Sequence, residues 1–324
     1  MALSLDIIKK PVAREIDEFE KYFRGSVKSN VVLLDKIMFY IVKRKGKQVR
    51  PLFVFLSAMA AGGVTERTHT AASLIELLHT ASLVHDDVVD ESLERRGFFS
   101  INALWKNKIA VLVGDYLLAQ GLIMAVDKEE FNLLRIVSKA VKEISEGELL
   151  QIEKARRLDI KEDIYYEIIR QKTASLISAA CESGASSAGA SEEICLLFRR
   201  FGEEVGIAFQ IKDDLFDYGV DDVGKPLGID IKEKKMTLPL IYALQNCNDS
   251  EKRHIINLIK NRSKEKKVIA EVIRFVNDKG GLIYATQKME EFTAKARKTL
   301  RQIGSNEAID SLEAMIQYVT ERKK

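Results

Sequence analysis

Two clusters of three aspartates each interrupt otherwise apolar segments and share the spacing D-D-x-x-D. Their members are Asp86, Asp87, Asp90, Asp213, Asp214 and Asp217. In a helix, the first and last acid of a cluster lie one turn apart on the same face. Carboxylates so close repel one another unless a cation lies between them, and their oxygens suit Mg2+, which proteins often hold together with substrate phosphates. A single cluster would more often be a solvated helix end, but two copies predict two facing carboxylate walls with metal ions and a polyanion between them.

A run of basic residues precedes a predicted helix at residues 52–61. The run ends at Pro51, which suits the first turn of a helix. Cations at a helix N-terminus are unfavourable unless an anion is bound there. Lys47 and Arg50 are therefore candidate phosphate ligands, and a solvated basic loop is the alternative.

His79 lies seven residues before Asp86 and therefore two helical turns back on the same face. A lone histidine among leucines is more often a core residue, but its alignment with the acids favours a role in a polar site. Arg95 and Arg96 follow the first cluster. Their spacing leaves two interpretations open, because they could pair with the aspartates or grip a phosphate.

Further polar residues lie near the second cluster or interrupt apolar helices. Gln210 shares a helix face with the second acid cluster, and Lys172 and Thr173 interrupt a small and apolar helical run. Residues 218–230 are rich in glycine, so we expect a loop that could close over the site as a lid. Several lysines, Lys235 among them, follow this loop.

Helical patterns cover most of the chain, whereas strand signals are weak. The four prolines leave the stretch between Pro51 and Pro226 uninterrupted. We therefore predict an all-α fold, a single domain over residues 1–324, with roughly ten or more helices of ordinary length. The predicted helices span about residues 7–23, 31–42, 52–61, 66–90, 137–155, 164–180 and 192–217, with another from about 238 and a flexible loop at 184–191.

The composition indicates a globular chain with a sizeable core, since 31% of the 324 residues are charged and 46% are hydrophobic. The net charge of +3 argues against a general nucleic-acid binder. Three cysteines without a pairing pattern and an N-terminal segment without a signal peptide predict a cytoplasmic location. Residues 109–126 are nearly long enough to span a membrane, but they contain Asp115 and Gln120, so we expect a buried helix of a bundle.

The motifs, taken together and in this order, resemble those of the trans-isoprenyl diphosphate synthases, or polyprenyl synthetases. The set comprises G-K-x-x-R-P at residues 46–51, H-x(6)-D-D-x-x-D-x(4)-R-R-G at 79–97, Lys172-Thr173, Gln210 with the second acid cluster, and Gly224-Lys225. This ordered set is very specific and spans nearly the whole chain. Residues 75–97 are most similar to the long-chain octaprenyl and heptaprenyl types that make quinone side chains. The resemblance implies an all-α barrel of helices around a deep central cavity, usually as a homodimer.

The resemblance also implies a role for each matching residue. The six aspartates would hold Mg2+, for which Mn2+ could substitute. The residues implied for catalysis are Asp86, Asp87, Asp90, Asp213, Asp214 and Lys172. The residues implied for the allylic diphosphate are Arg95, Lys172, Thr173, Gln210, Lys225 and Lys235. Those implied for isopentenyl diphosphate are Lys47, Arg50, His79 and Arg96.

The implied reaction condenses isopentenyl diphosphate with an allylic diphosphate. Metal ions and cationic side chains neutralise charge on the leaving diphosphate, so that its C–O bond ionises. The double bond of isopentenyl diphosphate attacks the allylic cation, and loss of a proton gives an all-trans product one isoprene unit longer. Water would quench such a cation, so the site needs apolar walls and a closing loop.

Product length depends on two small residues, Ala81 and Ser82, about one turn before the first acids. In short-chain members of the family, bulky aromatic residues close the product tunnel at these positions. We therefore expect a long product, heptaprenyl to decaprenyl, which serves a quinone side chain and passes to membrane enzymes. Phe53, Phe55 or Phe131 could plug the tunnel further down, so a farnesyl or geranylgeranyl product is the alternative.

Three other interpretations compete with this one. A class I terpene cyclase keeps the first cluster but normally has an N/D-x-x-S/T-x-x-x-E second site. A non-catalytic partner subunit of a heteromeric synthase tends to lose acids or arginines, and none is lost here. A helical nucleic-acid-binding module would need the basic clusters on one outer face. The chain departs from several short-chain relatives at Ile229, where they have lysine, so no phosphate contact is expected there.

Overall fold

The computed structural model describes residues 4–43, 46–95, 97–155, 158, 160–219 and 227–321. Arg96 and Lys225, two of the predicted site residues, lie outside the described residues, as does the side chain of Arg95. Most of the predicted lid, residues 220–226, lies outside them as well.

The described residues form an all-α fold, as predicted, and one short antiparallel hairpin of β1 (Glu94–Arg95) and β2 (Phe98–Phe99). The first acid cluster ends one long helix, and the second ends another. The helices are α1 (Leu5–Lys9), α2 (Ala13–Ser26), α3 (Val32–Lys43), α4 (Val49–Ala61), α5 (Glu66–Val89), α6 (Ile101–Asp127), α7 (Phe131–Ala155), α8 (Glu162–Ile169), α9 (Ser175–Ser187), α10 (Glu192–Phe216), α11 (Ile229–Lys232), α12 (Leu238–Gln245), α13 (Asp249–Arg262), α14 (Lys266–Asp278), α15 (Gly281–Ile303) and α16 (Glu307–Glu321).

The two acid-bearing helices begin and end close to the predicted residues. A capping box of Thr65 and Thr68 starts α5, and Asp90 is its C-cap. The Ser191 hydroxyl accepts a hydrogen bond from the backbone N–H of Ile194 at the start of α10. Ordinary capping chemistry therefore fixes where each acid cluster lies along its helix.

Three predicted boundaries are wrong. The segment 164–180 is not one helix, because a π-helical turn, η2 (Arg170–Ala174), separates α8 from α9. The segment 7–23 is divided by a 3-10 turn, η1 (Lys10–Val12), since Pro11 has no N–H for a helical hydrogen bond. The predicted loop at 184–191 begins later, because α9 continues to Ser187 with small residues that pack against neighbouring helices.

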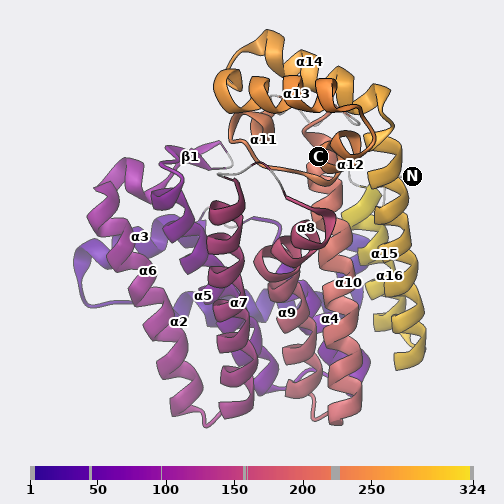
Figure 1. The fold of residues 1–324 in the computed structure, drawn as a ribbon. Helices are drawn as coiled ribbons and strands as arrows, with labels where there is room; N and C mark the ends of the chain where they lie inside the picture. The colour runs from indigo at the N-terminus through magenta and orange to yellow at the C-terminus, as the bar shows by residue number, and fades with distance from the viewer. Residues whose placement is uncertain are drawn as a thin grey trace.

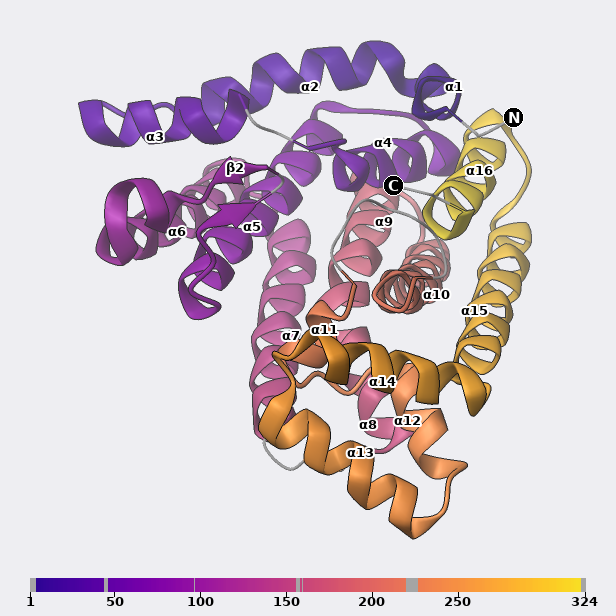
Figure 2. The ribbon, with the colours of Figure 1, turned by 90° about the horizontal axis from the view of Figure 1, so that it is seen from above.

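Helix α10 stands near the middle of the molecule, and α9, α15 and α16 pack around it (Figures 1 and 2). It also joins the two buried apolar clusters, since Phe198, Phe201 and Val205 belong to the first and Ile211 and Leu215 to the second. Helix α15 contributes to both clusters as well. Helices α13 and α14 lie across one end of the bundle, the upper end in Figure 1. That residues 1–324 make a single domain stays a prediction.

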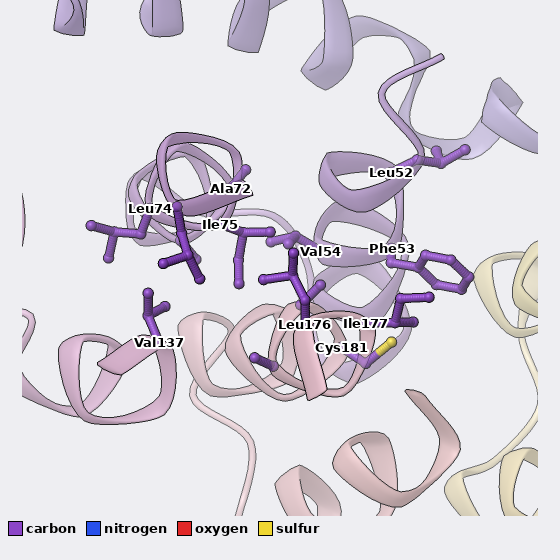
Figure 3. Packing of buried hydrophobic residues seen from close by; sticks show 14 of the residues in the cluster. Leu52, Phe53, Val54, Ala72, Leu74, Ile75, Val137, Leu176, Ile177 and Cys181 are labelled. Carbon is purple, nitrogen blue, oxygen red and sulfur yellow. The ribbon is translucent and has the colours of Figure 1, made fainter. Parts of the chain in front are cut away.

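The larger apolar cluster is densest where α4, α5, α7 and α9 meet. Figure 3 shows Val54, Leu74, Ile75, Val137 and Leu176 gathered there. Burying such a side chain stabilises the fold by roughly 1.5 to 3 kcal/mol. The acids at the end of α5 are therefore carried on a rigid apolar base.

Glycines let other helices approach the π-helical turn closely. A Cβ at Gly147 of α7 would lie 2.9 Å from the backbone nitrogen of Lys172, and one at Gly206 of α10 would lie 2.5 Å from the Cα of Ala174. Neither position has room for a methyl group. The backbone of η2 is therefore held between α7 and α10.

Helix α6 corrects the expectation of a buried helix for residues 109–126. Only 33% of its most apolar window is buried, and by length and composition alone it could cross a membrane. Ala110, Val113 and Leu117 face α5, but a stripe of apolar residues on the opposite side is exposed. The stripe consists of Val111, Leu112, Leu122, Ile123 and Val126.

Two cavities lie away from the acids. One of about 440 Å³ lies between α2 and α3, and one of about 760 Å³ is lined by α12 and α13. The deep central cavity implied by the family resemblance is neither of these two and stays a prediction.

We predict that Gly206→Ala destabilises the protein by about 1 to 3 kcal/mol, because the added methyl group must displace the backbone at Ala174. Urea unfolding followed by circular dichroism measures the effect. Gly25→Ala in α2 is the matched control, since a Cβ there meets nothing within 4 Å. Equal free energies of unfolding for the two variants would contradict the close packing of η2.

Candidate functional site

The two acid clusters lie at the same end of the bundle. The hairpin that follows α5 and the helix α11 that follows α10 are both at the upper end in Figure 1. Helix α9 packs against both α5 and α10 (Figure 2). The charge of Asp90 also raises the pKa of Lys235, which follows the second cluster, so the end of α5 lies close enough to Lys235 to affect it.

Asp214 is the most confined acid of the second cluster. Its side chain is 5% exposed, and its two oxygens accept hydrogen bonds from Gln210 Nε2 at 2.9 Å and from the Tyr165 hydroxyl at 2.7 Å. Burial, followed by the negative charge of Asp230, raises the pKa of Asp214 to about 8, although both hydrogen bonds oppose the shift. Burial therefore favours the neutral form of this carboxyl group.

Asp217 ends the second cluster and is directed at α11. Its Oδ1 accepts a hydrogen bond from the backbone N–H of Ile229 at 2.7 Å, and its Oδ2 accepts one from the N–H of Asp230 at 3.1 Å. Burial raises the pKa of Asp217, and these backbone hydrogen bonds counteract part of the shift. Asp213, the third member, is half-buried.

Lys172 and Thr173 lie on the π-helical turn, next to the second cluster. The Thr173 hydroxyl donates to Gln210 Oε1 at 2.7 Å, and Gln210 in turn donates to Asp214. Lys172 forms an ion pair with Glu148 of α7. Single-turn π-helical insertions occur frequently at functional sites, where they redirect side chains.

Lys235 is surrounded by acids. Its Nζ lies 2.5 Å from Glu233 Oε2 and 3.9 Å from Asp230 Oδ1. Burial lowers the pKa of Lys235, but Glu233, Asp230 and Asp90 raise it above its usual value on balance. The pKa of Asp230 is itself raised to about 6, by burial and then by the charge of Asp217.

The three acids of the first cluster differ in exposure. Asp87 is 4% exposed, Asp86 is half-buried, and Asp90 is exposed at the end of the helix. Asn102 of α6 donates to the backbone oxygens of Asp87 at 3.1 Å and of Ser92 at 3.0 Å. This amide ties the end of α5 to the start of α6.

Arg50 and His79, two of the residues implied for isopentenyl diphosphate, contact each other. Arg50 Nη1 donates to His79 Nε2 at 2.8 Å, so this imidazole nitrogen is the acceptor. The contact joins the first turn of α4 to the face of α5 that carries the acids. Lys47 is exposed, and its ammonium group lies 5.5 Å from the ring centre of Tyr318 on α16.

Ala81 and Ser82 lie on α5 below the first acids. Ala81 is fully buried, and Ser82 is half-buried with its hydroxyl donating to the backbone oxygen of His79 at 2.9 Å. The serine hydroxyl is thus turned back onto its own helix.

The donor set fits a hard divalent cation. Burial, and then the negative charge of a neighbouring aspartate, raises the pKa of Asp214 and of Asp230, and a bound cation would offset both effects. Among the described residues, no group of three or more histidine, cysteine or acidic side chains is gathered closely enough to hold a metal ion. A cation held by one or two of these carboxylates would complete its coordination with water or phosphate oxygens, as Mg2+ commonly does.

The sequence reasoning missed four residues that act on the site. Tyr165 and Asp230 contact or perturb Asp214, Glu148 pairs with Lys172, and Asn102 fixes the end of α5. Asp230 was the easiest to find, because it follows the glycine-rich segment and precedes Lys235 by five residues. The other three carried no motif, since their roles depend on contacts between distant helices.

The sequence profile of the polyprenyl synthetase family matches residues 31–276. The chain is 39% identical to the all-trans-nonaprenyl-diphosphate synthase (geranyl-diphosphate specific) of Rhodobacter capsulatus, over 90% of each chain. It is 32% identical to the geranylgeranyl diphosphate synthase of Sulfolobus acidocaldarius, over 95% of this chain and 97% of that one. Other relatives are named octaprenyl diphosphate synthase and heptaprenyl diphosphate synthase component 2.

Solved structures agree with the fold along the whole chain. The polyprenyl synthase of Caulobacter crescentus, complexed with calcium and isoprenyl diphosphate, superposes with a TM-score of 0.92 at 30% identity, covering 100% of this chain and 99% of that one. The helical fold, the ordered motifs and the family profile all indicate the same family. The chain therefore belongs to the polyprenyl synthetase family and is a prenyltransferase of the trans-prenyl diphosphate synthase class.

Proposed function

We propose that the chain extends an allylic diphosphate with isopentenyl diphosphate to a long all-trans prenyl diphosphate, heptaprenyl to decaprenyl, for a quinone side chain. The observation that carries the long product is the small pair on α5, where Ala81 is fully buried and Ser82 is half-buried. A product chain that starts at the acids and follows α5 meets no aromatic ring at these two positions. A relative named nonaprenyl synthase supports the proposal, and one named geranylgeranyl synthase keeps the short-chain alternative open.

Of the three phenylalanines that could have plugged the tunnel, one is exposed to solvent and two pack against other aromatic rings. Phe131 is 61% exposed at the start of α7. The ring of Phe55 packs edge-on against Phe19 of α2 at 5.6 Å between centroids, and Phe53 faces Phe201 of α10 at 6.5 Å. These contacts support an open path below the small pair.

Leucines are better candidates for the floor of the product tunnel. Leu78 and Leu74 lie one and two turns below Ser82 on the same face of α5, and both are buried. Figure 3 shows Leu74 between α5 and Val137 of α7. We propose that these leucines, rather than aromatic rings, limit the product.

The allylic diphosphate would bind between the two acid clusters. Lys172 and Lys235 bring positive charge to its leaving group, and Thr173 and Gln210 hold the polar chain that ends at Asp214. Mg2+, bound by the aspartates and by diphosphate oxygens, would supply further charge neutralisation at the leaving group. The apolar face of α5 below the acids excludes water from the allylic cation.

Isopentenyl diphosphate would bind at the start of α4. Arg50 offers a guanidinium group for a phosphate, and its hydrogen bond to His79 fixes its direction. Lys47 extends the positive charge toward solvent. The terminal double bond would then point along α5 toward the allylic carbon.

A non-catalytic partner subunit is the second candidate, because one relative is named as a component of heptaprenyl diphosphate synthase. Against it, both acid clusters and the Arg50–His79 pair are intact. Activity of the purified chain alone separates the two candidates.

The exposed stripe on α6 supports a homodimer. Five large apolar side chains on one face, each more than 40% exposed, are unusual for an isolated soluble chain. Helix α3, which also exposes Val32 and Phe39, lies on the same side of the molecule (Figure 2). We propose that a second copy of the chain covers this side and that the dimer is cytoplasmic.

We predict that the purified chain, given Mg2+, farnesyl diphosphate and labelled isopentenyl diphosphate, makes a ladder that ends between heptaprenyl and decaprenyl. Ser82→Phe should stop the ladder near geranylgeranyl, because the ring fills the path below the acids, whereas Ser82→Ala should leave the length unchanged. Chromatography of the dephosphorylated products measures both. A wild-type ladder that stops at geranylgeranyl would refute the long product, and no incorporation with any primer would favour the partner subunit.

We predict that the metal-free protein loses stability relative to Asp214→Asn as the pH rises from about 4 to about 8. The folded chain keeps the Asp214 proton up to about pH 8, but the unfolded chain releases it near the ordinary value of 3.8. The folded state therefore binds the extra proton between these values, and the free energy of unfolding falls as the pH rises. Thermal unfolding in chelator measures this, and parallel pH profiles for the two proteins would contradict it.

We predict that Leu112→Glu combined with Ile123→Glu converts a dimer into a monomer, because two charges cannot be buried at an apolar interface. Sedimentation velocity measures the state, with Leu196→Glu on α10 as the control, since Leu196 is another 50% exposed leucine. A wild-type monomer, or wild-type protein that floats with lipid vesicles, would overturn the dimer.

A further inference from the structure

Both carboxylate oxygens of Asp217, the last acid of the second cluster, accept hydrogen bonds from backbone N–H groups. They bind the N–H groups of Ile229 and Asp230, at 2.7 and 3.1 Å, at the start of α11. The backbone oxygen of Asp217 also accepts the N–H of Gly228 at 3.0 Å. Three consecutive amides thus converge on one residue, which is itself the C-cap of α10.

Helix α11 is held at this place from its other side as well. Gly228 has a φ of +73°, and a Cβ there would lie 2.2 Å from Ile269 Cγ2 of α14. Ile231 is fully buried in the second apolar cluster, and Ser263 donates to the backbone oxygen of Lys232 at 3.1 Å. The helix therefore stays attached to the core without Asp217, but the direction of its first turn depends on the carboxylate.

The turn that Asp217 holds carries groups that matter to the site. Asp230 raises the pKa of Asp214. The backbone N–H of Lys235 donates to the backbone oxygen of Asp230 at 2.8 Å. The charge of Asp90 in turn raises the pKa of Lys235. A shift of the first turn of α11 would move Asp230 directly and Lys235 through this hydrogen bond.

We propose that Asp217 does not ligate metal but is a positioning residue that fixes α11, and with it Asp230 and Lys235, against the acids. The inference rests on the proposed function for the role of Lys235 toward the allylic diphosphate. The second D-D-x-x-D cluster would then combine metal binding and the positioning of α11 at the end of one helix. Asp213 and Asp214 would remain to hold the metal ion, and Asp217 fixes the start of α11.

The test compares Asp217→Asn and Asp217→Ala with Asp213→Asn. Asparagine keeps one carbonyl oxygen for the N–H of Ile229, so it should rescue part of the effect, whereas alanine keeps neither bond. We expect the KM for farnesyl diphosphate to rise roughly tenfold in Asp217→Ala and less in Asp217→Asn, with the Mg2+ concentration for half-maximal rate unchanged. Asp213→Asn should instead raise that Mg2+ concentration.

A second readout needs no activity. Hydrogen exchange of the metal-free protein should become faster in the peptide that covers residues 227–236 in both Asp217 variants, and stay unchanged in the peptide that ends α5. Asp310→Asn, an exposed acid of α16, is the matched control. A double substitution with Lys235→Gln should raise the KM no further than Lys235→Gln alone, because both act through the same group.

Two results would overturn the proposal. One is a raised Mg2+ requirement in Asp217→Asn equal to that of Asp213→Asn, which would make Asp217 a ligand. The other is unchanged exchange at residues 227–236, which would show that the carboxylate does not hold α11. A wild-type protein without any prenyltransferase activity would instead refute the proposed function, and the exchange measurement would still decide the positioning role.

Discussion

Negative charge that is confined without enough compensation is the constraint on which this structure depends. Two helices end in aspartates at the same end of the bundle, and burial raises the pKa of Asp214 to about 8. A carboxylate that leaves water without a cation loses far more hydration energy than one hydrogen bond returns. Gln210 and Tyr165 donate hydrogen bonds to the Asp214 carboxyl group, but neither carries a positive charge that would neutralise it. A divalent cation held by these carboxylates would compensate the charge and would stabilise this end of the protein.

The positive side of the site is positioned by close backbone packing rather than by long side chains. Lys172 lies on a π-helical turn whose backbone packs against Gly147 and Gly206 so closely that neither glycine could carry a methyl group. Its ion pair with Glu148 keeps the ammonium group directed while no diphosphate is bound. A π-helical turn is less favourable than a regular α-helical one, so the contacts on both sides must hold it. The glycines are therefore part of the site, although they carry no chemistry.

The sequence predicted the positions of the acids well, because helical periodicity alone decides which residues share a face. The same argument placed His79 on the face of α5 that carries the acids, whereas its contact with Arg50 was found only in the structure. It failed where the outcome depends on contacts between distant segments. The π-helical turn, the bond from Tyr165 and the outward face of α6 have no local signal, because the same residues would suit an ordinary helix, a core tyrosine or a buried helix. The roles of Arg96 and Lys225 in binding diphosphates stay predictions.

Both acid clusters lie at the C-terminal ends of their helices, where the helix dipole is negative and disfavours further negative charge. Asp90 and Asp217 are the C-cap residues themselves, so they accept the largest part of this repulsion. The two ends resolve it differently. Asp90 stays exposed, and water solvates its charge, whereas Asp217 is buried and receives the amides that start α11, whose dipole has the opposite sign. The same spacing in sequence thus produces a solvent-exposed end on α5 and an end on α10 that is closed by the backbone of α11.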